Sequence, residues 1–188
     1  MCQNTAICDT PLIIHIRHFL TIDSCKQLIQ SMVTSQIDYA NSLLYGLPAA
    51  TLRPLQLLQN RAAKLVLGLK ATDSATDALK SLHWLPIKYR IDFKVACIVH
   101  KCLHGIAPSY LSDMVEPHIF HYATRHANQD GAITLKIPSF RKKCFASRSF
   151  HESGPRVWNA LPSNFRLIDN FNTFKRILKS HYFDLAFN

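Results

Sequence analysis

Four short phrases rich in Gly, Pro and Trp divide this 188-residue chain into segments with the apolar spacing of helices. In each phrase a glycine or a proline stands where an apolar repeat of three or four residues stops or begins again. Glycine after such a repeat and proline at its start are typical of helix ends rather than of catalytic chemistry. The pattern therefore predicts a scaffold of helices joined at defined points. The phrases are NSLLYGLP at 41–48, LHWLPI at 82–87, LHGIAPSYL at 103–111 and GPRVWNALP at 154–162.

Apolar residues recur at helical spacing along most of the chain. The clearest stripe precedes Gly68, which is predicted to end that helix. Thr21 is a candidate N-cap for the first helix, and Pro86 is predicted to lie in the first turn of a long one. We expect helices over residues 21–34, 36–45, 52–68, 75–82, 86–105, 108–115, 155–161 and 172–185.

Between residues 116 and 148 the helical periodicity disappears. Residues 132–137 alternate, with Ile133, Leu135 and Ile137 on one side, which is typical of a short strand. Residues 143–150 could supply its partner. The expected fold is therefore mainly α: a multi-helix bundle with a small β-hairpin near 132–150 and C-terminal helices. The change of pattern suggests a helical region over 1–115 and a C-terminal segment over 116–188, which could also form one continuous unit.

The composition fits a folded and strongly basic chain. Its 48% hydrophobic content can bury a core, and 22 basic against 12 acidic residues give a net charge of +10, which favours a polyanionic partner such as nucleic acid. No apolar run approaches the ~20 residues that cross a bilayer, and no signal peptide is recognisable. The six cysteines form no CxxC pair. We expect free thiols, no membrane contact and an intracellular location, either nuclear or cytoplasmic.

Acidic residues do not have the spacing of a polymerase site. Template-directed polymerisation needs carboxylates clustered around two metal ions, and the chain contains neither Asp-Asp nor Asp-x-Asp. Asp38 is the single carboxylate of the sequence Ile-Asp-Tyr-Ala and is expected to cap a helix or form a salt bridge. Residues 149–153 include Ser, His and Glu but no GxSxG elbow. We expect no enzyme activity, no catalytic residues and no cofactor for this chain alone.

One set of side chains has the spacing of metal ligands. Cys97, His100 and His104 would share a helical face, and Cys102 or His83 could add a fourth ligand. The alternative is that the cysteines are small core residues and that His104 belongs to a helix end. The sequence leaves both interpretations open, with a structural role favoured.

Basic residues gather in four runs that could contact phosphates. Each run also fits the solvated face of an amphipathic helix, so both interpretations stay open. The densest run interleaves cations with Phe140, Phe145 and Phe150, a pattern used by surfaces that bind single-stranded nucleic acids. The runs are Arg53, Gln56, Asn60 and Lys64 with Arg61 beside them; Lys88, Arg90, Lys94 and Lys101; Arg141, Lys142, Lys143 and Arg148; and Lys175, Arg176 and Lys179.

Taken together, the four phrases resemble the reverse transcriptases of non-LTR retrotransposons of the jockey and chicken-repeat type. The resemblance covers the region downstream of the polymerase palm and runs from about Leu12 to the C-terminus. It implies a thumb-like helical region that grips template and primer, followed by a C-terminal segment that helps to hold RNA or DNA. Some relatives carry a zinc knuckle near the C-terminus, and this chain lacks the matching spacing.

The resemblance places the palm and the endonuclease domain upstream of the matched region. We therefore expect a truncated or domesticated copy whose partner would be the palm and whose uncovered apolar face could cause self-association. Two hypotheses remain: a non-catalytic RNA- or DNA-binding module, or a helical structural or protein-interaction domain or inert remnant with no nucleic-acid role.

Overall fold

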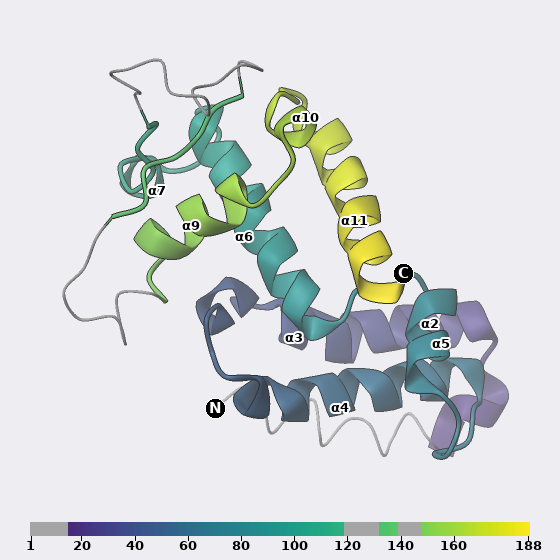
Figure 1. The fold of residues 1–188 in the computed structure, drawn as a ribbon. Coiled ribbons are helices and arrows are strands. Elements are labelled where there is room, and N and C mark those ends of the chain that lie inside the picture. Colours follow the sequence, from purple (N-terminus) through teal and green to yellow (C-terminus); the bar gives the residue numbers. More distant parts are fainter. Residues whose placement is uncertain (1–14, 119–131, 139–147) are drawn as a thin grey trace. The chain divides into compact units, whose positions relative to one another are not determined.

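The computed structural model describes residues 15–118, 132–138 and 148–188, which form a mainly helical protein (Figure 1). It divides into two compact units. Unit 1 comprises Met1–Asn41, Leu47–Arg90 and Phe183–Asn188, and unit 2 comprises Ser42–Gly46 and Ile91–Tyr182. The predicted α class is confirmed. The division proposed between residues 115 and 116 falls inside unit 2 and stays a prediction.

Unit 1 begins with a 3₁₀ turn, η1 (Arg17–Phe19), and helix α2 (Ile22–Ile29). The hydroxyl of Thr21 accepts the backbone N–H of Ser24, as expected of an N-cap. A π-helical turn, η2 (Gln30–Thr34), leads from α2 into α3 (Ser35–Asp38). The predicted helix over 21–34 is thus present, and the chain stays helical for four more residues.

The single helix predicted over 36–45 is wrong. Helix α3 ends at Asp38, and Ala40 adopts a left-handed conformation with φ 53°. The chain then forms a separate 3₁₀ turn, η3 (Asn41–Leu44), before Gly46. A left-handed residue cannot continue a right-handed helix, so the helix is interrupted here. The apolar spacing of the sequence continues across this point and therefore did not predict the break.

Helix α4 (Ala49–Leu67) ends as predicted at Gly68, which has φ 66°. The N–H groups of Gly68 and Leu69 bond back to the carbonyls of Leu65 and Lys64, the arrangement that glycine permits at a helix C-terminus. The guanidinium of Arg17 donates to the carbonyls of Leu65 and Val66 at 2.9 Å each. These contacts satisfy the carbonyl groups that a helix end leaves free.

Helices α2 and α5 (Ala75–Ser81) pack against α4 in unit 1. Trp84 and Leu85 of the LHWLPI phrase are buried in the turn between α5 and the long helix α6 (Ile87–Leu103). Pro86 precedes α6, and its carbonyl accepts the N–H of Arg90. The phrase thus lies at a helix start, where its proline was expected. The first turn of α6, up to Arg90, belongs to unit 1, and the rest of the helix belongs to unit 2.

Unit 2 is built around α6 from Ile91 onward, with α9 (Phe150–Asn159) and α11 (Phe171–Phe187) up to Tyr182 beside it (Figure 1). Trp158, Phe174 and Leu178 are buried at its centre. A Cβ on Gly154 would lie 3.1 Å from Cγ2 of Val99, so glycine allows α9 to approach α6 closely. Two short helices, α7 (Ser109–Ser112) and α10 (Ser163–Arg166), complete the unit.

The helix predicted over 155–161 begins five residues earlier than expected, at Phe150. Its predicted start, Pro155, lies inside α9 and is buried. The helix predicted over 108–115 is shortened to α7, which follows Pro108 directly. The long helices α6 and α11 agree with their predicted ranges to within a few residues, because their apolar stripes are long enough to fix them.

The β-hairpin predicted near 132–150 is not seen in the described residues. Phe150 already belongs to α9, while residues 139–147 lie outside the described part of the chain. Residues 132–138 are extended but pair instead with residues 116–118 through one isolated antiparallel bridge between Pro117 and Leu135. Two backbone bonds flank it: His118 N–H to the Thr134 carbonyl at 2.8 Å, and Lys136 N–H to the Glu116 carbonyl at 2.9 Å.

Side chains of α9 and α10 take the place of the missing second strand. The amide of Asn159 accepts the N–H of Leu135 at 2.9 Å and donates to its carbonyl at 2.7 Å. The indole of Trp158 donates to the carbonyl of Ile133 at 2.9 Å, and Arg166 donates to the same oxygen. Residues 116–118 and helix side chains thus share the backbone bonds of this segment. The predicted alternation does not correspond to one buried side, because Leu135 is buried while Ile133 and Ile137 are each 41% exposed.

Within the described ranges, no helix is long and apolar enough to cross a bilayer. Cys25, Cys97 and Cys102 are buried free thiols.

Candidate nucleic-acid interface

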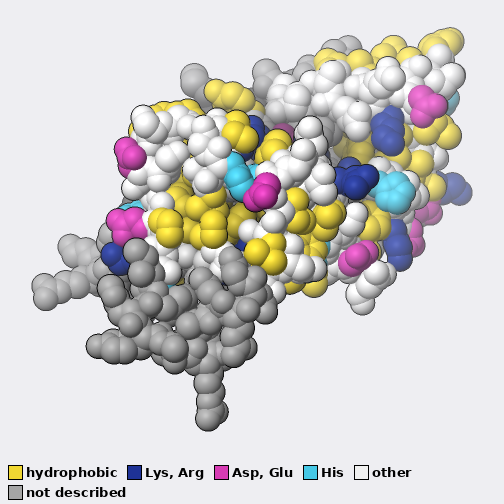
Figure 2. Space-filling view, turned by 90° about the horizontal axis from the view of Figure 1, so that it is seen from above, with side chains coloured by type: hydrophobic (Ala, Val, Ile, Leu, Met, Phe, Trp, Pro, Cys, Tyr) yellow, Lys and Arg dark blue, Asp and Glu magenta, His cyan; other side chains and the backbone are white. Residues whose placement is uncertain are grey.

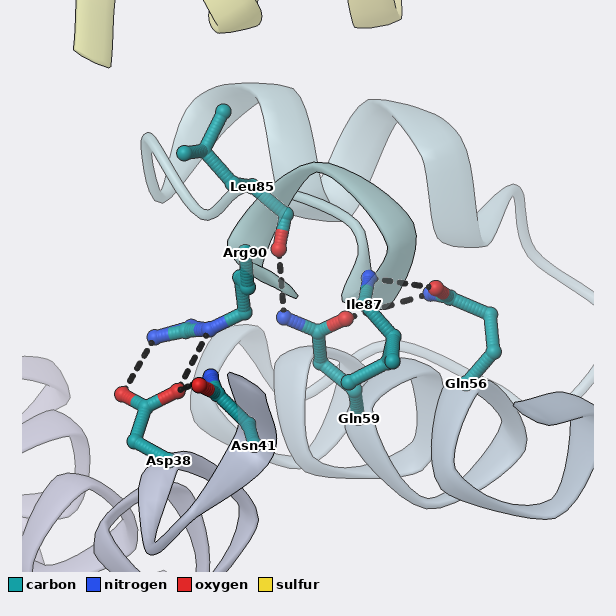
Figure 3. Close-up of polar contacts among 7 residues, drawn as sticks. All are labelled: Asp38, Asn41, Gln56, Gln59, Leu85, Ile87 and Arg90. Carbon is teal, nitrogen blue, oxygen red and sulfur yellow. Dashed lines mark hydrogen bonds and ion pairs between the residues drawn. The ribbon is translucent and has the colours of Figure 1, made fainter. Parts of the chain in front are cut away.

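The stripe predicted on α4 is largely used inside unit 1 (Figure 3). The side chain of Gln56 accepts the N–H of Ile87 and donates to the side-chain oxygens of Gln59 and Asn60. The buried Gln59 donates to the carbonyl of Leu85 at 2.8 Å. These bonds satisfy backbone groups at the start of α6, so Asn60 belongs to an internal polar network.

Lys64, the last member of that stripe, donates to the carbonyl of Ala71 at 2.7 Å. This bond ties the end of α4 to the loop that follows it. The charge of Lys64 remains, but its ammonium group has an intramolecular acceptor.

Arg90 forms a bidentate ion pair with Asp38, at 3.0 Å and 3.1 Å between nitrogen and oxygen (Figure 3). The arginine side chain is 17% exposed, and the amide of Asn41 also donates to Asp38. Burial lowers the pKa of Arg90, and the charge of Asp38 raises it. The expected salt bridge of Asp38 is confirmed. It holds the guanidinium of Arg90 in a contact within unit 1, and the predicted phosphate contact of Arg90 stays a prediction.

Three other predicted contacts in unit 1 face solvent. Arg53 and Arg61 are exposed on α4, and neither has a partner among the described residues. Lys88 is exposed, with its ammonium group 5.6 Å from the centre of the Tyr89 ring. In unit 2, Arg148 is exposed, while Arg141, Lys142 and Lys143 lie outside the described residues.

Three lysines from two helices meet on one face of unit 2. Lys94 and Lys101 are seven residues apart on α6, which places them two turns apart on the same side of the helix. The ammonium group of Lys101 lies 4.7 Å from the centre of the Phe171 ring, and Phe171 is one turn before Lys175 on α11. We call Lys94, Lys101 and Lys175 the lysine triad.

The electrostatics of Cys97 support this grouping. Burial raises the pKa of the Cys97 thiol to about 11, and the charges of Lys175, Lys94 and Lys101 act in the opposite direction. Each of the three ammonium groups is therefore close enough to the Cys97 thiol to affect its pKa. Neither Lys94 nor Lys175 forms an ion pair or a hydrogen bond with another described residue.

Unit 2 also carries most of the positive charge. Its sequence contains thirteen Lys and Arg against six Asp and Glu, compared with nine against six in unit 1. The positive charge of the sequence is therefore concentrated in unit 2.

The metal site considered for Cys97, His100 and His104 does not form. The described residues include no group of three or more His, Cys, Asp or Glu side chains that could hold a metal ion. His100 is fully buried, and its Nε2 donates to the carbonyl of Ile168 at 2.7 Å, because a carbonyl can only accept. Its ring stacks on Phe174 at 4.3 Å and lies 4.2 Å from the ring of His104. His100 thus fixes α6 to the segment that enters α11.

Two of the polar residues noted within 149–153 are buried in unit 2. The carboxylate of Glu152 is buried and lies 2.6 Å from a guanidinium nitrogen of Arg156, one turn further along α9. Ser153 is buried as well. The burial and pairing of Glu152 leave it in the interior of unit 2 rather than in an open site.

The sequence indicated Lys101 and Lys175 only as members of separate runs. Their proximity depends on how α11 packs on α6, and no spacing along the chain reports that. The available signal for their proximity was that each run lies on a helix whose opposite face is an apolar stripe, and two such helices can pack against each other. Searches with this chain find no matching family model, no matching curated protein and no matching solved structure.

Proposed function

We propose that this protein is a non-catalytic RNA- or DNA-binding module that contacts phosphates through the lysine triad of unit 2. The observation that carries the proposal is the meeting of Lys94, Lys101 and Lys175 from two helices, with no ion-pair partner on Lys94 or Lys175 among the described residues. Cations that share a face repel one another, and a bound polyanion relieves this repulsion.

The chemistry of the triad favours binding that ignores base sequence. A lysine ammonium is a point charge without the planar fork that reads a guanine edge. Lys101 already lies over Phe171, so its stem is held in place while its charge stays partly exposed. Three phosphate contacts give log K a slope against log salt of about −2.7 on duplex DNA and about −2.1 on a single strand.

The proposal includes an origin. The four Gly, Pro and Trp phrases resemble the post-palm region of non-LTR retrotransposon reverse transcriptases, and a fragment of that region would hold nucleic acid for chemistry performed by a separate palm. The sequence supports a non-catalytic role because it has no paired aspartates. The ion pair between Asp38 and Arg90 supports it further, since it gives the one polymerase-like carboxylate a structural task.

The test is a titration of fluorescein-labelled 20-nucleotide RNA, single-stranded DNA and duplex DNA, followed by anisotropy between about 50 and 250 mM salt. The test variant is Lys94→Ala/Lys101→Ala/Lys175→Ala. The matched control is Lys26→Ala/Lys70→Ala/Lys80→Ala, which removes the same charge from unit 1. Circular dichroism of both variants checks that they remain helical.

We expect the triad variant to lower the salt slope by about 2 to 3 and the control to leave it nearly unchanged. Equal losses in both variants would show that net charge alone causes binding, which contradicts the proposal. Absence of binding to all three nucleic acids at the lowest salt would contradict it as well.

A protein-interaction domain is the second candidate, because several large apolar side chains are uncovered. Phe19 is 89% exposed, and Tyr39 and Leu43 are each 76% exposed. Figure 2 shows hydrophobic side chains open to solvent between separate charged groups on one face of the molecule. Light scattering after size exclusion tests this candidate: concentration-dependent dimers or larger species support it, whereas a monomer that binds RNA supports the first proposal.

A further inference from the structure

The solvent face of α4 has a composition unlike that of the lysine triad. In a helix, positions four and eight residues apart lie within about 80° of arc. This relation places Arg53, Leu57 and Arg61 on one strip, which we call the α4 strip. The buried residues Gln59, Ala62, Ala63 and Val66 lie on the opposite side of the helix.

The α4 strip carries positive charge that nothing within the described residues neutralises. Arg53 and Arg61 are exposed and make no ion pair or hydrogen bond with another described residue. Helix α4 contains no Asp or Glu over its 19 residues, while Lys64 adds a third cation near the same face. The strip therefore complements an acidic surface.

Between the two arginines the strip presents an apolar side chain. Leu57 is 46% exposed, and the two arginines flank it one turn away on either side. A rise of 1.5 Å per residue separates the arginine Cα atoms by about 12 Å along the axis. An uncovered leucine gains from burial against another apolar group, and a sugar-phosphate backbone offers none.

The choice of cation is compatible with a protein contact. Arginine is enriched and lysine depleted at protein interfaces, where the guanidinium fork matches a carboxylate. Because the same fork also matches a phosphate, the feature that favours a protein partner is the exposed Leu57 between the two arginines.

We propose that the α4 strip binds an acidic segment of another protein, in which two carboxylates meet Arg53 and Arg61 and an apolar side chain between them covers Leu57. This site lies in unit 1 and is independent of the lysine triad.

The test uses the full chain and a phage-displayed library of random 16-residue peptides. Peptides selected on the unaltered chain are synthesised and titrated against Arg53→Ala/Arg61→Ala and against Leu57→Ser. The matched control is Lys70→Ala/Lys80→Ala, which removes two exposed charges from the same unit. A 20-nucleotide RNA is titrated against the same variants.

We expect selected peptides to carry Asp or Glu on both sides of an apolar residue. Their affinity should fall about ten-fold in the double arginine variant, fall in Leu57→Ser and change less than about two-fold in the control. Peptides without acidic residues, or equal losses in the control, would overturn the proposal. A loss of RNA binding specific to the arginine variant would overturn it too, because the strip would then be a phosphate contact. None of these results decides whether the lysine triad binds nucleic acid, because that proposal is tested separately with Lys94→Ala/Lys101→Ala/Lys175→Ala.

Discussion

Replacing Asn159 by Ala should destabilise unit 2, because this one side chain satisfies both backbone groups of Leu135. Leu135 is 1% exposed, and its N–H and carbonyl bond to the Asn159 amide at 2.9 Å and 2.7 Å. An unsatisfied buried polar group costs about 1–3 kcal/mol. Two such groups give about 2–6 kcal/mol, less a few tenths because alanine favours the end of α9.

The assay is urea unfolding followed by tryptophan fluorescence and circular dichroism. Asn159→Asp gives an intermediate case, because a carboxylate can accept the Leu135 N–H but cannot donate to its carbonyl. Asn172→Ala serves as the control, since Asn172 is exposed in the first turn of α11. A loss below about 0.5 kcal/mol for Asn159→Ala would refute the account of how residues 132–138 are held.

Three further predictions address local chemistry. Burial lowers the pKa of His100, as does the charge of His104, while the Ile168 bond and Asp169 oppose the shift. The unfolded chain therefore binds this proton more readily, so stability is present above about pH 6.5 and is lost as the pH falls through that value. His100→Phe should make the urea midpoint less sensitive between about pH 7 and 5, and an unchanged pH dependence would contradict this assignment. Ala40→Gly should stabilise unit 1 by about 0.5–1 kcal/mol, because the φ angle of Ala40 is 53°. The control Ala50→Gly, in α4, should destabilise unit 1 by a similar amount, and thermal melts of both variants measure the two changes. A change of the same sign in both variants would be inconsistent with strain at Ala40. Lys142→Ala/Lys143→Ala should lower the salt slope of RNA binding by about 1.4 if both lysines contact phosphates. An unchanged slope would show that the run Arg141, Lys142 and Lys143 does not contact the nucleic acid.

Helix ends were the most predictable part of the fold, because glycine and proline act through their own backbone. Gly68 and Gly105 both have φ 66° and end α4 and α6 where the sequence placed them. The break after Asp38 was missed because alanine at position 40 gives no local signal of a left-handed residue.

The hairpin illustrates a different limit. Alternation at Ile133, Leu135 and Ile137 predicts a strand with one apolar side, yet only Leu135 is buried, while Ile133 and Ile137 are each 41% exposed. The alternation also does not identify the groups that satisfy the backbone. Here the partners are Asn159 and Trp158, from a helix more than twenty residues away. Sequence periodicity carries no information about such a long-range side-chain bond.

Individual basic residues could be found from the sequence, but their surroundings could not. Arg90 and Lys94 follow the same helical spacing, yet Arg90 is paired with Asp38 and Lys94 faces solvent. The lysine triad depends on the packing of α11 beside α6, which the sequence does not report. Pairing and packing are tertiary properties, so a stripe of cations predicts a candidate surface and not its free charges.

Lysine footprinting tests the central claim most directly. The full chain is acetylated briefly with and without a saturating 20-nucleotide RNA, and the modification of each lysine is measured by mass spectrometry. The account predicts that RNA protects Lys94, Lys101 and Lys175, whereas Lys26, Lys70 and Lys80 keep their reactivity. Uniform protection of all six lysines, or protection confined to unit 1, would contradict it.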